Sequence, residues 1–343
     1  MALTPKTLSP RPARLTNRTG TRPRPRAPKA APLRLRRIMM PTDFSPAANA
    51  VLPAAVKWCE RFGAELHFVH VCAVAYYTPS LMVSPVVVPE SQIRKEARSH
   101  LQDLAQEHAG LLRHVRLHIS KGRPYQEICR IARELEVDLI ITATRGRTGL
   151  KHLTLGSTAE RVIRHAPCPV LALHSPPGSA RLRAPALRKI LVPTDFSPGA
   201  AHGLSYARAL ATNFGARLIL LHSVDLHYYS TNPDYILLDL PPLLAAAEKA
   251  SAQQLREFVE ESDWKGLKVE STLERGHPGE QVCRRAQELE ADLIVTSTHG
   301  RTGLKRALLG STAEYIVRHA SCPVLVVPSH ARPARRARKG ARG

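Results

Sequence analysis

The chain contains one internal duplication, and matching residues of its two copies are about 152–154 positions apart. Residues Pro41 to Pro46 read Pro-Thr-Asp-Phe-Ser-Pro, and the same six recur from Pro193 to Pro198. Each copy later carries a Gly-rich stretch, 144–160 in the first half and 298–314 in the second. A period of this length is far longer than that of a solenoid repeat, so the duplication predicts two complete domains of one fold. A length of 343 residues agrees with two domains.

Apolar runs and amphipathic segments alternate within each half. In the first half we predict strands at 37–41, 64–71, 113–119, 138–143 and 169–173, and helices at 46–62, 90–108, 124–136 and 158–165. Ser45 is expected to cap the first helix and Pro46 to start it, whereas Pro53 is expected to kink it. The pattern restarts at residue 189. This alternation predicts an α/β fold, with a doubly wound, five-stranded parallel sheet in each half.

Composition sets the expected domain boundaries. Residues 1–37 hold 11 Lys and Arg, residues 329–343 hold 6, and neither segment contains Asp or Glu. Because high charge with many prolines and few aromatics predicts disorder, most of the net charge of +22 is assigned to two tails. We expect disordered basic tails at 1–34 and 329–343, domains at 35–174 and 187–328, and a linker at 175–186. The tails could contact nucleic-acid phosphates weakly and without sequence preference, and a solvated tail with no function is an equal alternative.

Apolar and cysteine content bear on location. No apolar run approaches the ~20 residues of a membrane-spanning helix, so we expect a soluble, cytoplasmic protein without membrane contact. The 6 cysteines include no Cys-x-x-Cys pair, which argues against a metal site or a disulfide. Cys168 and Cys322 each precede Pro-Val-Leu and are expected to be small buried residues in a reducing compartment.

Each Gly-rich stretch lies between a predicted buried strand and a predicted helix, where α/β proteins bind phosphates. Glycine lets the backbone approach an anion, and the first free N–H groups of the helix point at it. Ser157 and Ser311 add hydroxyl donors at the helix start. The alternative is that the glycines only make turns and the serines only cap helices. Two copies at one spacing favour the phosphate-binding interpretation.

Asp43 and Asp195 follow the first strand of each half. In an open parallel sheet, ligands bind beyond the carboxyl ends of the strands, where the strand order reverses. The Asp and the Gly-rich loop are therefore expected to meet at one crevice. There the carboxylate can accept hydrogen bonds from ribose hydroxyls or bind a divalent cation. A turn or cap role for the Asp is the alternative.

Together these motifs resemble the universal stress protein family, in a tandem two-domain form. The resemblance rests on Pro-Thr-Asp-Phe-Ser, on His-Gly-Arg-Thr-Gly-Leu-Lys, on the Gly-Ser pair that follows, and on Cys-Pro-Val-Leu. It covers nearly everything outside the tails. It implies a Rossmann-like sheet of strand order 3-2-1-4-5 in each domain and ATP binding without rapid turnover. It also implies that the domains pair through their last strands within the chain, with a homodimer as an open alternative.

The resemblance also implies the residues of the site. In the ATP-binding branch, the loop reads Gly, two residues, Gly, nine residues, then Gly-Ser or Gly-Thr, and here Ala143 and Ser297 replace the leading Gly. The implied cofactor is ATP, with or without Mg²⁺, and no residue is implied as catalytic or as a protein metal ligand. Val71 and Ser223 would contact adenine through their backbones. The implied ATP-binding residues are Thr42, Asp43, Val71, Gly146, Gly149, Gly156, Ser157 and Thr158, and in the second half Thr194, Asp195, Ser223, Gly300, Gly303, Gly310, Ser311 and Thr312.

Three classes of function are compatible with these features. The first is an ATP-binding stress-response or regulatory protein that is not an enzyme or that hydrolyses ATP slowly, with a nucleotide-free dimerising signalling module as its variant. Arg145 occupies the place of His299, which argues against a catalytic His in the loops. The second is an α-hydrolase-type enzyme, whose pyrophosphate-releasing members use a Ser-Gly-Gly-x-Asp-Ser loop that this chain lacks after its first strand. The third is a nucleic-acid binder acting through its tails. The stress and the partner stay open.

Overall fold

A computed structural model of the chain describes residues 33–73, 90–106, 115–144, 155–174, 187–225, 240–298, 300, 309–329 and 331. Most of the predicted tails and the whole predicted linker lie outside these residues. The predicted alternation of strands and helices is confirmed in both halves. The first half contains β1 (Arg37–Pro41), α1 (Pro46–Asn49), α2 (Leu52–Phe62), β2 (Glu65–Ala73), α3 (Glu90–Gln106), β3 (Val115–Gly122), α4 (Pro124–Glu134), β4 (Leu139–Ala143), α5 (Ser157–His165) and β5 (Val170–Leu173).

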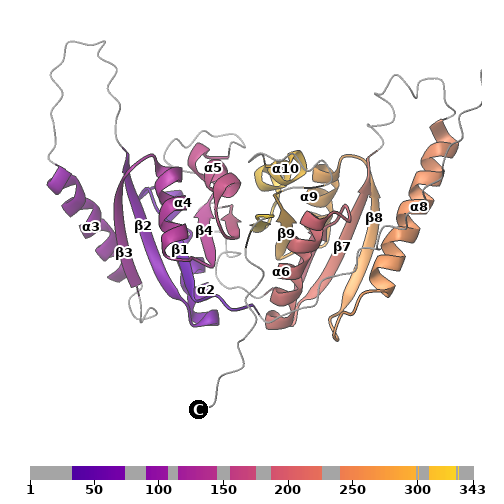
Figure 1. The fold of residues 1–343 in the computed structure, drawn as a ribbon, viewed down its shortest axis with the longest axis horizontal. Helices are drawn as coiled ribbons and strands as arrows, with labels where there is room; N and C mark the ends of the chain where they lie inside the picture. Colours follow the sequence, from indigo (N-terminus) through magenta and orange to yellow (C-terminus); the bar gives the residue numbers. More distant parts are fainter. Residues whose placement is uncertain are drawn as a thin grey trace, which may run out of the picture.

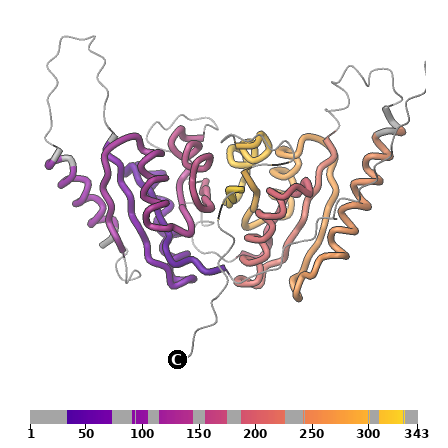
Figure 2. The backbone as a smooth tube through the Cα atoms, in the orientation of Figure 1, coloured from indigo at the N-terminus to yellow at the C-terminus, as the bar shows by residue number. Residues whose placement is uncertain are grey.

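The second half repeats this order with one helix fewer at its start. It contains β6 (Lys189–Pro193), α6 (Pro198–Phe214), β7 (Arg217–Val224), α8 (Leu240–Glu260), β8 (Val269–Arg275), α9 (Pro278–Glu288), β9 (Leu293–Ser297), α10 (Ser311–His319) and β10 (Val324–Val327). Figure 2 shows the two halves side by side, the first from indigo to magenta and the second from salmon to yellow.

The ten strands within the described residues form one sheet, in the order β3-β2-β1-β4-β5-β10-β9-β6-β7-β8. Each half is parallel and has the predicted strand order 3-2-1-4-5. The halves join where β5 and β10 pair in an antiparallel arrangement, with Leu171 opposite Leu325. The predicted pairing of the domains through their last strands is therefore confirmed within the chain. Helices α3 and α8 lie at the two outer ends of the molecule, and α5 and α10 meet near its centre (Figure 1).

Helices cover both faces of the sheet, as a doubly wound fold requires. One apolar core contains side chains of α2, α3, α6 and α8, and the other contains side chains of α4, α5, α9 and α10. The central strands are almost wholly buried because they pack against helices on both sides. This packing leaves the carboxyl ends of β1 and β4, and of β6 and β9, as the rim where loops can bind a ligand.

Pro53 divides the first helix of the chain into two. The helix predicted at 46–62 is α1 and α2, with Pro53 in the first turn of α2, where a missing N–H costs no hydrogen bond. Ser205 occupies the matching place in α6, which is continuous over 17 residues. A break, not a kink, is therefore how the fold accommodates this proline.

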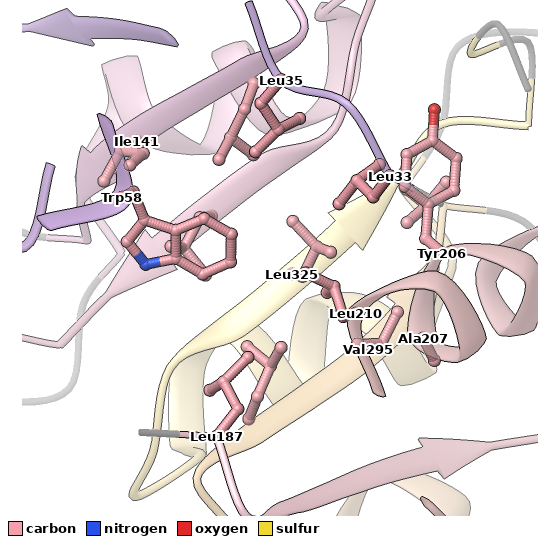
Figure 3. Close-up of a cluster of buried hydrophobic side chains, with 14 of the residues drawn as sticks. Leu33, Leu35, Trp58, Ile141, Leu187, Tyr206, Ala207, Leu210, Val295 and Leu325 are labelled. Atoms are coloured by element: carbon pink, nitrogen blue, oxygen red, sulfur yellow. The ribbon is translucent and has the colours of Figure 1, made fainter. Parts of the chain in front are cut away.

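Two residues that the sequence analysis assigns to the tails are buried. Leu33 is 6% exposed and Ala331 is 5% exposed, and both belong to the core that spans the two halves. Figure 3 shows Leu33, from the segment before β1, in one cluster with Tyr206 of α6 and Leu325 of β10. The Asn213 side-chain amide also donates to the Leu33 carbonyl at 3.3 Å. The packed body therefore begins before residue 35 and extends beyond residue 328.

We expect Leu33→Ala to lower the free energy of unfolding by about 2 kcal/mol, because it removes apolar contacts made with the second half. Arg34→Ala is the matched control, since Arg34 is exposed. Urea denaturation of both variants measures the difference. A loss below ~0.5 kcal/mol for Leu33→Ala would mean that the segment before β1 contributes nothing to the core.

A pair of histidines, of which His67 is buried and His118 half-buried, predicts weaker folding in acid. His67 of β2 and His118 of β3 approach to 2.9 Å between Nδ1 and Nε2, and burial lowers the pKa of both rings. Below the unfolded pKa, near 6.5, the unfolded chain therefore binds more protons than the folded chain, and acid favours unfolding. We expect the free energy of unfolding to be lower at pH 5 than at pH 7.5.

The second half supplies the control for this pH dependence, because Ile219 and Thr272 occupy the matching places. His67→Ile with His118→Thr should flatten the decrease in the free energy of unfolding between pH 7.5 and pH 5. Chemical denaturation across this range measures it. An unchanged pH dependence would show that other groups cause the acid sensitivity.

Candidate functional site

A tight turn follows the first strand of each half and fixes the predicted Asp. In the first half the Thr42 Oγ1 accepts from the Phe44 N–H at 3.0 Å, and the Asp43 Oδ1 accepts from the Ser45 N–H at 3.0 Å. The turn places Phe44 at φ 61°, a strained value for a residue with a side chain. Asp195 makes the same bond to the Ser197 N–H at 3.0 Å. The turn role weighed for the Asp is therefore present, and it uses one carboxylate oxygen.

His70 and His222, at the ends of β2 and β7, support this turn. The His70 Nδ1 lies 2.9 Å from the Thr42 carbonyl, and the His222 Nδ1 lies 2.7 Å from the Thr194 carbonyl. A carbonyl only accepts, so Nδ1 carries the proton in both rings. Phe44 stacks on the His70 ring at 4.3 Å. Both imidazoles thus hold the turn in place.

The Gly-rich stretches end on open helix N-termini. Gly156 is the N-cap residue of α5 and Gly310 that of α10, and neither helix has a side-chain cap. The Gly156 N–H donates to the Thr144 carbonyl at 2.8 Å, and the Gly310 N–H donates to the Thr298 carbonyl at 2.9 Å. These bonds close each loop at its base. The serines that follow, Ser157 and Ser311, are the first residues of the helices and not their caps.

The turn and the helix N-terminus line one cavity in each half. The cavity of the first half has a volume of about 240 Å³. That of the second half has a volume of about 670 Å³. Thirteen predicted residues line them, namely Thr42, Asp43, Val71, Gly156, Ser157 and Thr158 in the first, and Thr194, Asp195, Ser223, Gly300, Gly310, Ser311 and Thr312 in the second. Gly146, Gly149 and Gly303 lie outside the described residues.

The backbone at position 300 lies so close to the Asp195 carboxylate that only glycine fits there. A Cβ on Gly300 would lie 2.7 Å from the Asp195 Oδ2, closer than any side-chain carbon can come. The Gly-rich stretch and the carboxylate are therefore in direct contact, as predicted from their places in the sheet. Ala143 and Ser297, which replace the leading Gly of the loop, line the two cavities as well.

Several lining residues were not predicted. Pro124 and Pro278 begin α4 and α9 and line the cavities, and the sequence analysis gives position 124 only as the start of a helix. Asp225 after β7 and Ser251 of α8 line the second cavity alone. The first half has Ala73 and Ala97 at the places of Asp225 and Ser251. The internal duplication therefore does not mark these two residues as part of the site.

The fold agrees with comparisons to known proteins. The sequence profile of the "Universal stress protein family" matches residues 34–174 and 186–328. The chain belongs to the universal stress protein family. A universal stress protein of Mycolicibacterium smegmatis is 26% identical over 300 residues, covering 82% of this chain and 94% of the relative. One from Methanocaldococcus jannaschii is 34% identical over 141 residues, covering 41% of this chain and 81% of the relative.

A crystal structure of a universal stress protein from Archaeoglobus fulgidus shares the fold. Its TM-score is 0.61 at 21% identity, and the match covers 85% of this chain and 98% of that one. The predicted tandem arrangement of two universal stress protein domains is thus confirmed by the family match and by this likeness of fold.

Four of the 6 cysteines of this universal stress protein, Cys59, Cys129, Cys168 and Cys322, are buried. Cys168 and Cys322 are 5% and 2% exposed, which confirms their predicted burial. Burial raises the pKa of the Cys59 thiol to about 12 and that of Cys129 to about 11, so both are protonated at neutral pH. None of the 6 cysteines, all of which the structure describes, forms a disulfide bond.

The described ranges contain no group of three or more His, Cys, Asp or Glu side chains able to bind a metal ion. No helix there is both long and apolar enough to cross a bilayer.

Proposed function

We propose that this universal stress protein binds an adenine nucleotide in each half and acts as a stress-response regulator, not as a rapid enzyme. One observation carries the proposal. In the second half Asp195, the end of β7 and the uncapped N-terminus of α10 line a single cavity of about 670 Å³. A ribose, a flat base and a polyphosphate, respectively, need these three kinds of contact.

The residues present fit ATP. The free N–H groups of Ser311 and Thr312, with the Ser311 hydroxyl, would bind phosphate oxygens at the positive end of the helix dipole. The second carboxylate oxygen of Asp195 faces Gly300 and would accept from a ribose hydroxyl. The Ser223 backbone would contact the adenine edge. Asp43, Val71, Gly156, Ser157 and Thr158 would take these roles in the first half.

A divalent cation would depend on the nucleotide for most of its ligands. The carboxylates lining the second cavity are those of Asp195 and Asp225. Mg²⁺ prefers six oxygen ligands and keeps several waters, so phosphate oxygens would supply the rest. We therefore expect Mg²⁺ to strengthen ATP binding without being a resident metal.

We expect slow ATP hydrolysis because of the side chains that line the second cavity. His222 is the single imidazole among the described lining residues, and its Nδ1–H is engaged by the Thr194 carbonyl. A rapid hydrolase would need a base aimed at an attacking water. A cytoplasmic location and a homodimer stay predictions.

The two halves differ in a way that favours a nucleotide-free alternative for the first half. Its cavity has a volume of about 240 Å³, against about 670 Å³ in the second half. If only one half binds nucleotide, it should be the second. The first half would then serve as a structural partner.

Copurification tests the proposal without added ligand. The protein is purified at low salt without nucleotide, denatured in acid, and the supernatant is separated by ion-exchange chromatography. We expect adenine nucleotide in the supernatant, and a phosphate-release rate well below one per minute with added MgATP. Rapid turnover would favour the α-hydrolase alternative. Absence of any bound or bindable nucleotide would favour the nucleotide-free signalling module.

A further inference from the structure

The second cavity has an extension that the first cavity lacks, on the side where α8 packs against β7 and β8 (Figure 1). Asp225, which directly follows β7, lines this extension together with Ala247 and Ser251 of α8. Among the described residues, the first cavity is lined by none from α3, the helix that matches α8. We call Asp225, Ala247 and Ser251 the α8 extension of the second cavity.

An ion pair joins α8 to the end of the sheet beside β7. Arg275 lies opposite Val224 in the register of β7 and β8. Its Nη2 donates to one oxygen of the Glu248 carboxylate at 2.6 Å, and its Nε lies 2.5 Å from the other. Residues three apart on a helix lie on one side of it, so Ser251 stands on the same side of α8 as Glu248. The ion pair therefore holds this turn of α8 near the end of β7, where Asp225 follows.

Two polar groups at the end of β7 are already used within the protein. The Ser223 hydroxyl donates to the Gly276 carbonyl at 2.7 Å, and the Val224 carbonyl accepts from the Gly276 N–H at 2.9 Å. The side-chain acceptor that follows them along the chain is the Asp225 carboxylate. A carboxylate has about four acceptor positions, so Asp225 can accept from a base while it also contacts the protein.

We propose that Asp225 recognises the base in the second half by accepting a hydrogen bond from the 6-amino group of adenine. The Ser251 hydroxyl would donate to the ring nitrogen next to that group. A 6-oxo group has no proton to donate and would turn its own partial negative charge toward the carboxylate, so a site of this kind rejects it. The first half has Ala73 and Ala97 at these places and lacks both polar groups. This inference rests on the proposed nucleotide site and adds the residue that selects its base.

Calorimetry on the variant Gly156→Val, which is designed to block the first site, tests this role in the second site alone. It compares ATP with purine riboside 5′-triphosphate, which differs only by lacking the 6-amino group. With Asp225 present, ATP should bind at least tenfold more tightly, because a hydrogen bond to a charged acceptor is strong. Adding Asp225→Ala installs the residue of the first half and should reduce this preference to within about twofold. The loss should come from weaker binding of ATP, with the affinity for purine riboside triphosphate changed by less than about twofold.

Glu260→Ala is the matched control for the change of charge. Glu260 is the last residue of α8, is exposed and does not line the cavity. Its replacement removes one carboxylate, as Asp225→Ala does, and should leave the affinities for both triphosphates within about twofold. Circular dichroism checks that every variant is folded. A tenfold loss of ATP binding in Glu260→Ala would mean that net charge sets the affinity, and it would overturn the role of Asp225.

Other results would overturn the role of Asp225 while leaving a nucleotide site in place. An equal loss of both triphosphates in Asp225→Ala would mean that the carboxylate acts on the phosphates, on a cation or on the fold, and not on the base. An unchanged preference for ATP would mean that the base does not reach it. Tighter binding of GTP than of ATP, lost in Asp225→Ala, would mean that the carboxylate accepts from guanine. If neither wild type nor Gly156→Val binds any of the three nucleotides, the proposed function itself fails, and this inference with it.

Discussion

Replacing Gly310 with valine should remove one of the two ATP molecules that the wild-type chain is expected to bind. Gly310 has φ −61°, which any residue adopts, so the substitution should not strain the backbone. A Cβ would lie 3.3 Å from the Thr298 carbonyl oxygen, and the branched side chain would stand beside the first N–H groups of α10. Losing one or two charge-assisted hydrogen bonds, roughly 1.5–3 kcal/mol each, means about tenfold weaker binding or more.

Gly156→Val is the matched change in the first half, and the double variant combines the two. Each single variant should bind about one ATP per chain and the double variant none, with circular dichroism melts close to wild type. If Gly310→Val alone removes all binding, the first half is a structural copy. If the folded double variant binds with wild-type affinity, the Gly-rich stretches are only turns.

Substitution at the junction of the two halves should have the largest effect on stability. Leu325 of β10 is 2% exposed and lies opposite Leu171 of β5, which is 1% exposed. Leu325→Ala should lower the free energy of unfolding by about 2–5 kcal/mol, because it leaves a cavity between the halves. Leu325→Asp would bury an unpaired charge and should prevent folding of the chain.

A double-mutant cycle assigns this loss to the junction. Leu171→Ala and Leu325→Ala should be non-additive by more than ~0.5 kcal/mol, because the residues share one contact. Leu66→Ala, in β2, is the control, since three strands separate β2 from β10. Its combination with Leu325→Ala should be additive in urea denaturation. A loss below ~1 kcal/mol for Leu325→Ala would contradict the junction as a major source of stability.

Much of the fold could be predicted because the spacing of apolar residues and the residues that start or end helices are local signals in the sequence. Ser45 and Pro46 mark a helix start whatever surrounds them, and the observed N-cap bond, which the Ala48 N–H donates to the Ser45 hydroxyl oxygen, matches this. The sequence predicts a kink at Pro53, but the chain breaks there into two helices. At the matching place α6 has no proline and is continuous. Leu33 and Ala331 were missed because each is an isolated apolar residue in a segment rich in Pro and Arg. Only the packing of the two halves explains their burial.

Part of the candidate site could likewise be predicted from the sequence, and part could not. Asp195 and Gly310 could be predicted, since the ends of adjacent parallel strands meet at one rim. The contact between Gly300 and Asp195 is a tertiary approach that no spacing specifies. Arg208 is a similar case: it is 0% exposed and lies 4.9 Å from the Trp264 ring, where the first half has Val56. A buried guanidinium of this kind has no periodic signature.

Isothermal titration calorimetry with ATP and GTP, each with and without Mg²⁺, tests nucleotide binding most directly. The protein is first stripped of copurified nucleotide by partial denaturation and refolding, and refolding is checked by circular dichroism. We predict saturable binding of ATP at about two per chain, or one if the first half is a structural copy. We predict at least tenfold weaker binding of GTP. No heat with ATP under either condition, from protein that has refolded, would contradict an adenine-nucleotide site in either half.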